Sequence, residues 1–336
     1  MKKLILLYIL LIVGCRELDD CDGVKRGMAE VDDCGECVRG TTGLVYNYLM
    51  DCSGECNGNA TLDDCEVCDS DSTNDCVQDN CGIWGGIGGV EIFGGCYNIH
   101  VTTTLNLSQS ELVGEIPSEI GNLINLKNLD LSFNTLQGVI PPEISNLTNL
   151  EYLNLSRNEL TGEIHNLFTN LTKLESIRLH ANQLDGILPE ELWDLFHLRE
   201  LYLGDNNFSG EVSGDIGDLL NLEELWLGKN NFTGELPDRI WTLSNLWGLW
   251  LEENNFEGII PSAISNLIQL TELYLSDNQF ISLPDEICSL PITSYTSTYE
   301  WEGETWKYFD ITNNKLCSYP ACIADYVGTQ DTSNCP

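Results

Sequence analysis

Residues 126–149 read LKNLDLSFNTLQGVIPPEISNLTN, and this pattern returns every 24 residues through most of the chain. A leucine opens each of seven consecutive units without a slip: Leu126, Leu150, Leu174, Leu198, Leu222, Leu246 and Leu270. A fixed period of this length is the sequence signature of a repeat solenoid. One unit cannot bury its own apolar face, so we expect the units to stack and to need a cap at each end.

Each unit predicts a short strand followed by a turn. The LDL alternation at residues 129–131 places two leucines on one side of a strand. The asparagine that follows, Asn134, can satisfy backbone groups left by the turn and form a ladder between stacked units. Gly138 then permits a tight return, and the Ile-Pro pair at 140–141 fixes an extended backbone.

These repeats resemble the leucine-rich repeat family, and the L-x-G-x-I-P half resembles its extracellular, plant-receptor-like subclass. The resemblance covers roughly residues 81–335. It implies a solenoid with a curved parallel sheet on its concave face, short 3-10 or irregular segments on the convex side, and a concave face that binds another macromolecule. His165 and Ser213 depart from the pattern by replacing the proline, and the unit at Leu270 lacks the glycine.

The composition divides the chain into five predicted segments. Residues 1–14 form a lipoprotein signal peptide, and residues 15–80 form a Cys/Asp-rich stalk that lifts the solenoid from the membrane. Residues 81–101 form the N-terminal cap and residues 102–290 the repeats. Residues 291–336 hold a final repeat with an insertion and the C-terminal cap.

The first residues predict export. Two lysines precede an apolar run at residues 4–13, which is too short to span a bilayer. The following IVGC at 12–15 resembles the lipobox of bacterial lipoproteins, which implies cleavage before Cys15 and lipidation of its sulfur. An ordinary secretory peptide with an incidental cysteine is the alternative. We expect an exported lipoprotein at the outer membrane or cell surface, held to the membrane by its lipid anchor only.

Charge and cysteine content agree with that compartment. The chain has 15 basic and 53 acidic residues, a net charge of -38, which argues against nucleic acid as a partner. A highly solvated surface explains the charge, and attraction of cationic partners or calcium is the alternative. Of the 15 cysteines, lipidation of Cys15 leaves an even number suited to disulfides in an exported protein.

The stalk contains two copies of a 31-residue repeat. Its C-x-x-C pairs at 34–37 and 65–68 could complete a zinc site, but export favours disulfides. Asp69, Asp71 and Asp75 alternate oxygen ligands that suit calcium, and an unliganded acidic loop explains them equally well. We expect no other cofactor.

Cysteines also mark both caps of the solenoid. The stretch at 81–101 resembles the N-terminal cap of plant-type repeats, which implies that Cys81 pairs with Cys96 and that Trp84 covers the first unit. Strand alternation on both sides of residues 302–304 predicts a hairpin within the insertion. Four cysteines would lock the C-terminal cap in one of three pairings that the sequence leaves open: Cys288, Cys317, Cys322 and Cys335.

The concave face carries the candidate site. The central strand positions form one predicted column: Asn106, Asp130, Asn154, Arg178, Tyr202, Trp226, Trp250, Tyr274 and Asp310. Its four aromatic members predict a flat, exposed strip that could stack on sugar rings or hold apolar anchors of a peptide. Trp247 lies beside the strip, and Arg178, Glu200, Glu224 and Glu272 would fix a ligand's orientation. Alternatively, Tyr and Trp simply suit strand positions and cross-strand pairing.

The pattern does not support an enzyme. His180 falls beside Arg178 on the concave face, but no serine or cysteine nucleophile with an orienting acid follows from the repeat. We therefore predict a non-enzymatic surface recognition or adhesion module for a protein or peptide. The alternative is a carbohydrate-binding or carbohydrate-enzyme-inhibiting module, and a third interpretation is an envelope spacer without a specific ligand.

Overall fold

The computed structural model describes residues 89–165, 167–292, 298–301, 304–333 and 335, together with four two-residue strands nearer the N-terminus. The chain divides into two compact units, Met1–Ile87 and Gly88–Pro336. Cys15, the possible zinc pairs as complete sets, and the calcium ligands Asp71 and Asp75 lie outside the described residues, and Asp69 is described only as the end of a strand.

The described elements of the first unit are two antiparallel strand pairs. Strand β1 (Glu30–Val31) pairs with β2 (Cys37–Val38), and β3 (Thr61–Leu62) pairs with β4 (Cys68–Asp69). The second pair follows the first by 31 residues, which is the spacing of the sequence repeat in this segment.

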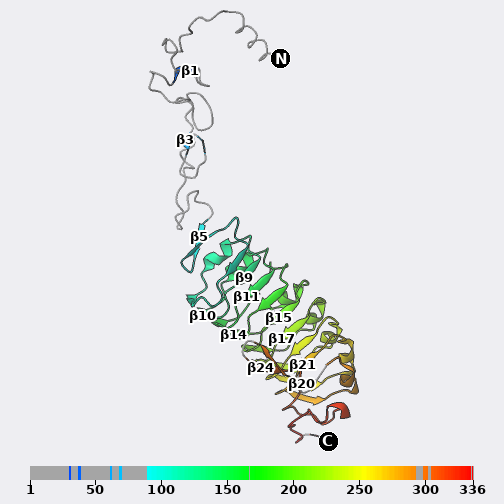
Figure 1. The fold of residues 1–336 in the computed structure, drawn as a ribbon. Helices are drawn as coiled ribbons and strands as arrows, with labels where there is room; N and C mark the ends of the chain where they lie inside the picture. The colour runs from blue at the N-terminus through cyan, green and yellow to red at the C-terminus, as the bar shows by residue number, and fades with distance from the viewer. Residues whose placement is uncertain are drawn as a thin grey trace, which may run out of the picture. The chain divides into compact units, whose positions relative to one another are not determined.

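The second unit is built on a parallel sheet of nine strands, which follow one another in Figure 1. Each strand comes from the L-x-L part of one repeat, because the leucines that flank it are fully buried in a continuous core. The strands are β7 (Thr104–Asn106), β9 (Asn128–Asp130), β11 (Tyr152–Asn154), β13 (Ser176–Arg178), β15 (Glu200–Tyr202), β17 (Glu224–Trp226), β19 (Gly248–Trp250), β21 (Glu272–Tyr274) and β25 (Phe309–Asp310). The predicted solenoid and its concave sheet are confirmed.

A second parallel sheet of eight strands runs along the other side of the repeats, where irregular structure was predicted. It follows each asparagine and ends at or near the repeat glycine, whose φ lies between 75° and 88° in the repeats from Gly114 to Gly258. The strands are β8 (Val113–Glu115), β10 (Thr135–Gly138), β12 (Glu159–Gly162), β14 (Gln183–Gly186), β16 (Asn207–Gly210), β18 (Asn231–Glu235), β20 (Asn255–Ile259) and β22 (Gln279–Ser282).

Short 3-10 turns complete the convex side, most of them preceded by the repeat proline. They are η1 (Ser118–Asn122), η2 (Pro142–Asn146), η3 (Glu190–Asp194), η4 (Gly214–Asp218), η5 (Asp238–Thr242), η6 (Ser262–Asn266), η7 (Asp285–Ser289) and η8 (Ala321–Ile323). Where Ser213 replaces proline, its hydroxyl accepts a hydrogen bond from the Asp215 backbone N–H instead. In the unit with His165, the described residues contain no 3-10 turn.

The asparagine ladder is present and joins neighbouring repeats. The Asn158 amide donates to the Leu131 carbonyl of the preceding repeat at 3.0 Å and to Leu155 of its own at 3.1 Å. Its oxygen accepts from the Leu136 N–H at 3.0 Å. Because these groups are buried, each ladder residue satisfies backbone atoms that would otherwise lack partners.

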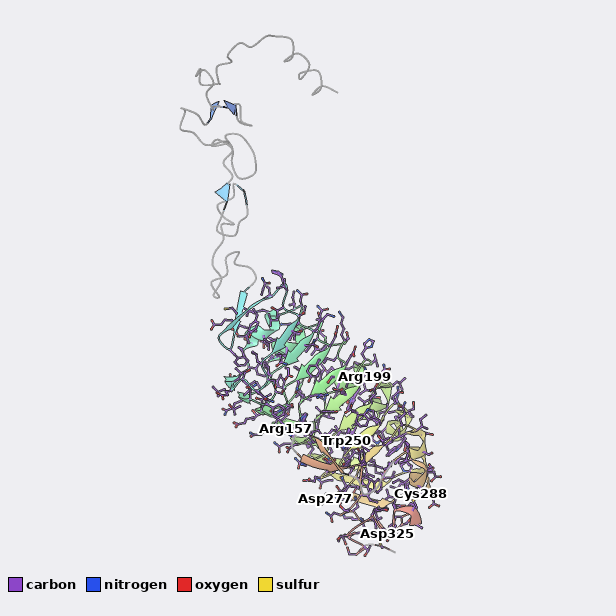
Figure 2. The ribbon with its side chains drawn as sticks, in the orientation of Figure 1. Arg157, Arg199, Trp250, Asp277, Cys288 and Asp325 are labelled. Carbon is purple, nitrogen blue, oxygen red and sulfur yellow. A yellow bond between two sulfur atoms is a disulfide. The ribbon has the colours of Figure 1, made fainter. Side chains whose placement is uncertain are left out.

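Both caps of the solenoid contain disulfides. At the N-terminal end, hairpin β5 (Gly89–Ile92) and β6 (Gly95–Asn98) holds Cys96, which is disulfide-bonded, while its predicted partner Cys81 and Trp84 lie outside the described residues. At the other end, near the labels Cys288 and Asp325 in Figure 2, Cys288 bonds Cys322. The remaining pair there is Cys317–Cys335, so one of the three possible pairings is established.

The insertion before the last repeat forms the predicted hairpin. Strand β23 (Thr298–Trp301) pairs antiparallel with β24 (Glu304–Lys307). The following chain enters β25, which completes the nine-stranded sheet beside β21. None of the helices among the described residues has the length and apolar character required to cross a membrane.

Candidate functional site

The predicted column on the concave face exists in full. Every member pairs in register with the member on the next strand, from Asn106 opposite Asp130 to Tyr274 opposite Asp310. The structure therefore brings Arg178, Tyr202, Trp226, Trp250 and Tyr274 together on five adjacent strands, as the spacing of 24 residues requires.

The exposure predicted for the aromatic strip is wrong. Only 6% of Tyr202, 5% of Trp226, 7% of Trp250 and 5% of Tyr274 is exposed, and the four form a hydrophobic cluster of their own, with Trp247 packed against it. We call these four residues the aromatic cluster. The strip is not flat either, because the rings of Tyr202 and Trp226 meet edge to face at 6.2 Å between centroids. The rings pack on one another and do not form an open platform.

A glycine that follows the preceding strand explains how the Trp226 ring lies down on the sheet. A Cβ on Gly204 would stand 2.2 Å from the Trp226 ring, so the indole occupies the space that a side chain there would fill. His180 lies on one side of this indole, with 4.9 Å between ring centroids. On the other side, the indole N–H donates to Glu252 at 3.1 Å.

Tyr202 and Trp250 lie in the opposite direction, toward the starts of the strands. The Tyr202 hydroxyl donates to the Glu224 carboxylate. Trp250 covers Gly248 and meets Trp247 edge to face at 5.7 Å. The Trp226 ring points in the opposite direction, so the Tyr202 and Trp250 rings meet across the strand between them, with 6.4 Å between their centroids.

Two carboxyl groups accept hydrogen bonds from side chains of the aromatic cluster. Burial, together with the nearby charge of Glu200, raises the pKa of Glu224 to about 7. Burial also raises the pKa of Glu252 to about 7, against the hydrogen bond from Trp226. One Glu252 oxygen accepts that bond, and the other has no hydrogen-bond donor among the described residues. Both groups therefore change charge near neutral pH.

The margin of the cluster on the N-terminal side is an ordered polar network. Arg178 donates to the Glu200 carboxylate from two nitrogens, at 3.1 and 2.8 Å, and its guanidinium lies 5.0 Å from the Tyr202 ring centroid. The Ser176 hydroxyl adds a third hydrogen bond to Glu200 at 2.7 Å. Arg178 and Glu200, both predicted as site residues, therefore neutralise each other beside the cluster.

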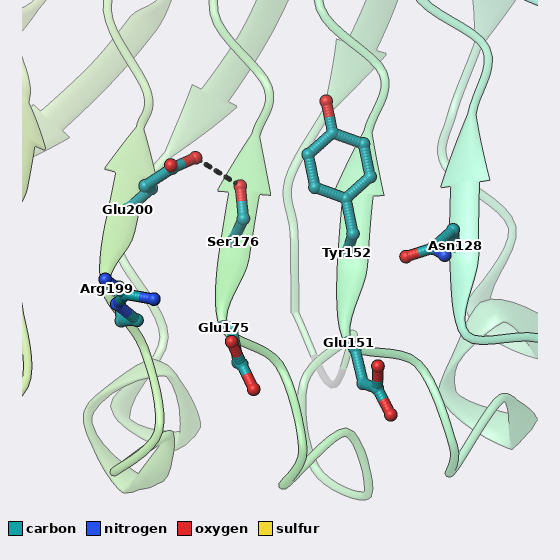
Figure 3. A pocket seen from close by; sticks show the side chains of 7 residues that line it. All are labelled: Asn128, Glu151, Tyr152, Glu175, Ser176, Arg199 and Glu200. Atoms are coloured by element: carbon teal, nitrogen blue, oxygen red, sulfur yellow. Dashed lines mark hydrogen bonds between the residues drawn. The ribbon is translucent and has the colours of Figure 1, made fainter.

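A shallow pocket of about 240 Å³ opens next to this network, near the starts of β9 to β15. Figure 3 shows Tyr152, Ser176 and Glu200 on neighbouring strands, with Glu151 and Glu175 where their strands begin. Glu151 is paired with Lys127 at 2.7 Å. The exposed Glu175 carboxylate has no ion pair among the described residues. The full lining is Asn128, Glu151, Tyr152, Glu175, Ser176, Arg199 and Glu200.

The family Leucine rich repeat matches this chain over residues 101–160 and again over 173–195, 197–219, 221–243, 245–267 and 269–290. The chain is a leucine-rich repeat protein. A comparison with curated protein sequences found no match.

Solved structures with similar repeats come from plants and from a bacterium. The ectodomain of the membrane receptor kinase GASSHO1/SCHENGEN3 from Arabidopsis thaliana, in complex with CASPARIAN STRIP INTEGRITY FACTOR 2, is 31% identical, with a TM-score of 0.57. The plant peptide hormone receptor RGFR1 in complex with RGF2 is 30% identical, with a TM-score of 0.52. Each match covers 64% of this chain, but only 27% and 36% of those proteins. A leucine-rich repeat protein of Leptospira interrogans is 29% identical over 67% of this chain and 58% of its own, with a TM-score of 0.50.

The described part of this leucine-rich repeat protein contains no group of three or more His, Cys, Asp or Glu side chains arranged to hold a metal ion. His180, the one histidine predicted on the concave face, is fully buried against the rings of Tyr202 and Trp226. It is therefore part of the packing around the aromatic cluster.

Sequence reasoning missed the residues that decide how the cluster packs. Gly204 and Gly228 follow the strand leucines at a position where other repeats have Ser132, Ser156 or Glu252. Two consecutive repeats, the one before Trp226 and the one that contains it, therefore lack a polar side chain at this position. That absence was the signal in the sequence. Glu252, which accepts the hydrogen bond from the Trp226 indole, is likewise buried, with 5% of its surface exposed.

Proposed function

We propose that this protein is a non-enzymatic recognition or adhesion module that binds a protein or peptide through the concave face. The observation that carries this proposal is the unbroken register of the nine-stranded sheet, which sets one side chain per repeat in a regular column. Two similar plant receptors were solved with a bound partner: one with CASPARIAN STRIP INTEGRITY FACTOR 2, and the peptide hormone receptor RGFR1 with RGF2. These complexes support a peptide as ligand. The Ile-Pro positions and these identities also support membership of the plant-receptor-like subclass.

The pocket in the N-terminal half of the sheet is the proposed contact point. Its acidic lining and the net charge of -38 favour a ligand with basic side chains, because opposite charges steer association. Arg178 and Lys127 already pair with Glu200 and Glu151. Glu175 is therefore the carboxylate that a lysine or arginine of the ligand would contact without displacing an existing ion pair.

Charge reversal in this pocket tests the proposal. Peptides selected from a displayed random library against the full chain should bind the parent and bind Glu151→Lys/Glu175→Lys about tenfold more weakly, or worse. Glu211→Lys/Glu235→Lys is the matched control, because both residues are exposed on the other sheet side of the repeats. Equal losses in both variants would show non-specific charge attraction, and no loss in either would place binding elsewhere.

The carbohydrate-binding alternative is weakened by the burial of the aromatic cluster. Stacking on a sugar ring requires an exposed aromatic face, and among the described aromatic residues packed against the cluster, the partly exposed one is Trp247. A glycan array would revive the alternative if saturable sugar binding were lost on Trp247→Ala.

We further propose that the chain is an exported lipoprotein anchored through Cys15 at the outer membrane or cell surface. The lipobox-like residues 12–15 support this, and the two disulfides of the C-terminal cap fit an oxidising compartment. Radiolabelled palmitate should be incorporated into the parent in a bacterial host and not into Cys15→Ala. Equal labelling of both, or of neither, would contradict the anchor.

A further inference from the structure

A second shallow pocket continues the first along the edge where the concave strands begin. It has a volume of about 420 Å³, and Glu175 and Arg199 line both pockets. Figure 3 shows Glu151, Glu175 and Arg199 one after another at the starts of β11, β13 and β15. The two pockets are therefore parts of one groove, which we call the edge groove.

One residue from each repeat forms a continuous row along the edge groove. The backbone N–H of each member donates to the carbonyl of the member in the preceding repeat, at 2.8 or 2.9 Å. Because neighbouring strands of a sheet are about 4.8 Å apart, the place of a residue in this row gives its distance along the groove. The members that matter here are Lys127, Glu151, Glu175, Arg199, Glu223 and Trp247.

Ion pairs occupy most of the charged residues in this row and leave Glu175 open. Lys127 pairs with Glu151 at 2.7 Å, and Arg199 pairs with Glu223 at 2.8 Å. The exposed carboxylate of Glu175 stands between these two pairs, without an ion pair of its own among the described residues. A ligand cation at Glu175 therefore gains a partner and displaces none.

A second open place lies where Trp247 follows Glu223 in the row. Trp247 is partly exposed, unlike the aromatic cluster on which it packs. Both hydrogen bonds from Arg199 end on Glu223 Oε1, at 3.0 and 2.8 Å, and none of the described residues donates to Oε2. A guanidinium stacks on aromatic faces and donates to carboxylates, so an indole one strand away from a carboxylate oxygen suits an arginine.

The distance between these two places sets the spacing of a ligand. Trp247 is three strands along from Glu175, which is about 14 Å. In an extended peptide, side chains an even number of residues apart share a face, at about 3.4 Å per residue. Side chains two residues apart are therefore separated by about 7 Å, and side chains four residues apart by about 14 Å. A separation of four matches the groove.

We propose that the edge groove binds an extended peptide at two basic anchors: a lysine or arginine at Glu175, and an arginine four residues away between Trp247 and Glu223. This inference rests on the proposed function, which supplies the peptide and the contact at Glu175. It adds the second anchor, the spacing and the need for a guanidinium. The aromatic cluster then holds the Trp247 ring in place, since Trp250 meets that ring edge to face at 5.7 Å.

Fluorescence anisotropy of synthetic peptides with the full chain tests the spacing. Each peptide is a fluorescein-labelled Gly-Ser chain with one lysine and one arginine, placed two, four or six residues apart. The net charge is the same in all three, so charge attraction alone predicts equal affinities. We expect the spacing of four to bind about fivefold more tightly than the other two. Equal affinities at the three spacings, or no binding of the peptide with the spacing of four, would overturn the proposal.

A mutant cycle distinguishes a direct contact of Trp247 from a structural role. Trp247→Ala should weaken binding of the peptide with the spacing of four about fivefold. It should change little the binding of the same peptide with citrulline, which has the shape of arginine without its charge. Equal weakening of both peptides would show that the variant only disturbs the fold, and the second anchor would be refuted. Tyr319→Ala, which removes a 43% exposed aromatic side chain in the C-terminal cap, is the matched control.

Glu175→Gln separates this inference from the proposed function. It should weaken the arginine and the citrulline peptides alike, because both keep the lysine, and exposed Glu211→Gln should weaken neither. If Glu175→Gln weakens binding at every spacing while Trp247→Ala has no effect, the proposed pocket stands and the second anchor fails. If Glu175→Gln weakens none of the peptides, the contact at Glu175 fails, and this inference fails with it.

Discussion

The indole of Trp226 fills the space that a side chain at Gly204 would need. A Cβ at position 204 would lie 2.2 Å from one ring carbon of Trp226 and 2.5 Å from two further ring atoms. Gly204 lies two residues after Tyr202, so the space that the Trp226 ring fills is provided by the preceding repeat. A glycine with ordinary backbone angles is required here for space alone.

Gly204→Ala should therefore destabilise the protein by about 1–3 kcal/mol, since the indole must move in a packed cluster. Gly214→Ala is the control, because a Cβ there has nothing within 4 Å. Denaturant unfolding of both variants beside the parent measures the difference. Equal unfolding midpoints for the two alanine variants would show that the ring shifts without cost.

The buried carboxyl of Glu252 should make stability depend on pH. Its pKa is about 7 in the folded chain against an ordinary value of 4.5. The unfolded chain therefore loses this proton first as pH rises, and stability falls between pH 4.5 and pH 7. The difference corresponds to about 3 kcal/mol from this residue alone.

Glu252→Gln keeps an oxygen for the Trp226 N–H and removes the charge. We expect the loss of unfolding free energy between about pH 5 and about pH 8 to shrink by about that amount in the variant. Glu253→Gln, one residue away and exposed, serves as the control. Parallel pH profiles for parent and Glu252→Gln would contradict a buried, proton-binding carboxyl.

Breaking one rung of the asparagine ladder should affect two repeats at once. Asn206 donates to Leu179 of the preceding repeat at 3.0 Å and accepts from the Leu184 N–H at 3.0 Å. Asn206→Ala leaves these buried backbone groups unsatisfied, which costs about 1–3 kcal/mol. Asn221→Ala removes an exposed bond to Phe196 and should change the unfolding midpoint little. Similar effects of the two would remove the ladder's special role.

The two C-terminal disulfides should differ in their contribution. Cys288–Cys322 closes 34 residues and Cys317–Cys335 closes 18. Loop-closure entropy then predicts about 4 and about 3 kcal/mol, respectively. The double serine variant of the first pair should release the C-terminal cap to limited proteolysis sooner than that of the second. The reverse order would show that local contacts, and not chain entropy, hold the cap.

The repeat period made the geometry of the column predictable. Because strands recur every 24 residues and pair in register, Tyr202, Trp226 and Trp250 had to stand on neighbouring strands. The asparagine ladder followed for the same reason. Both depend only on spacing and on the need to satisfy buried backbone groups.

Exposure was not predictable in the same way. It depends on which direction each ring takes, and that depends on Gly204 and Gly248, which lie outside the column. The second sheet was missed because its strands contain a glycine, which is usually a turn signal. The disulfide pairing in the C-terminal cap was not predictable either, because four cysteines allow three arrangements and the fold decides among them.

The alternating directions of Tyr202, Trp226 and Trp250 restrict how this array can change length. Deleting the repeat of Trp226 would set Tyr202 and Trp250 on adjacent strands, both lying toward the strand starts and both claiming the same space. Duplicating it would place two indoles that lie in the same direction on adjacent strands, which breaks the alternation. Between Asn106 and Asn154, where side chains are short, we expect single repeats to be gained or lost freely. Across the aromatic cluster, repeats can be exchanged only in pairs, so this half of the solenoid should keep its repeat number while the other half varies among relatives.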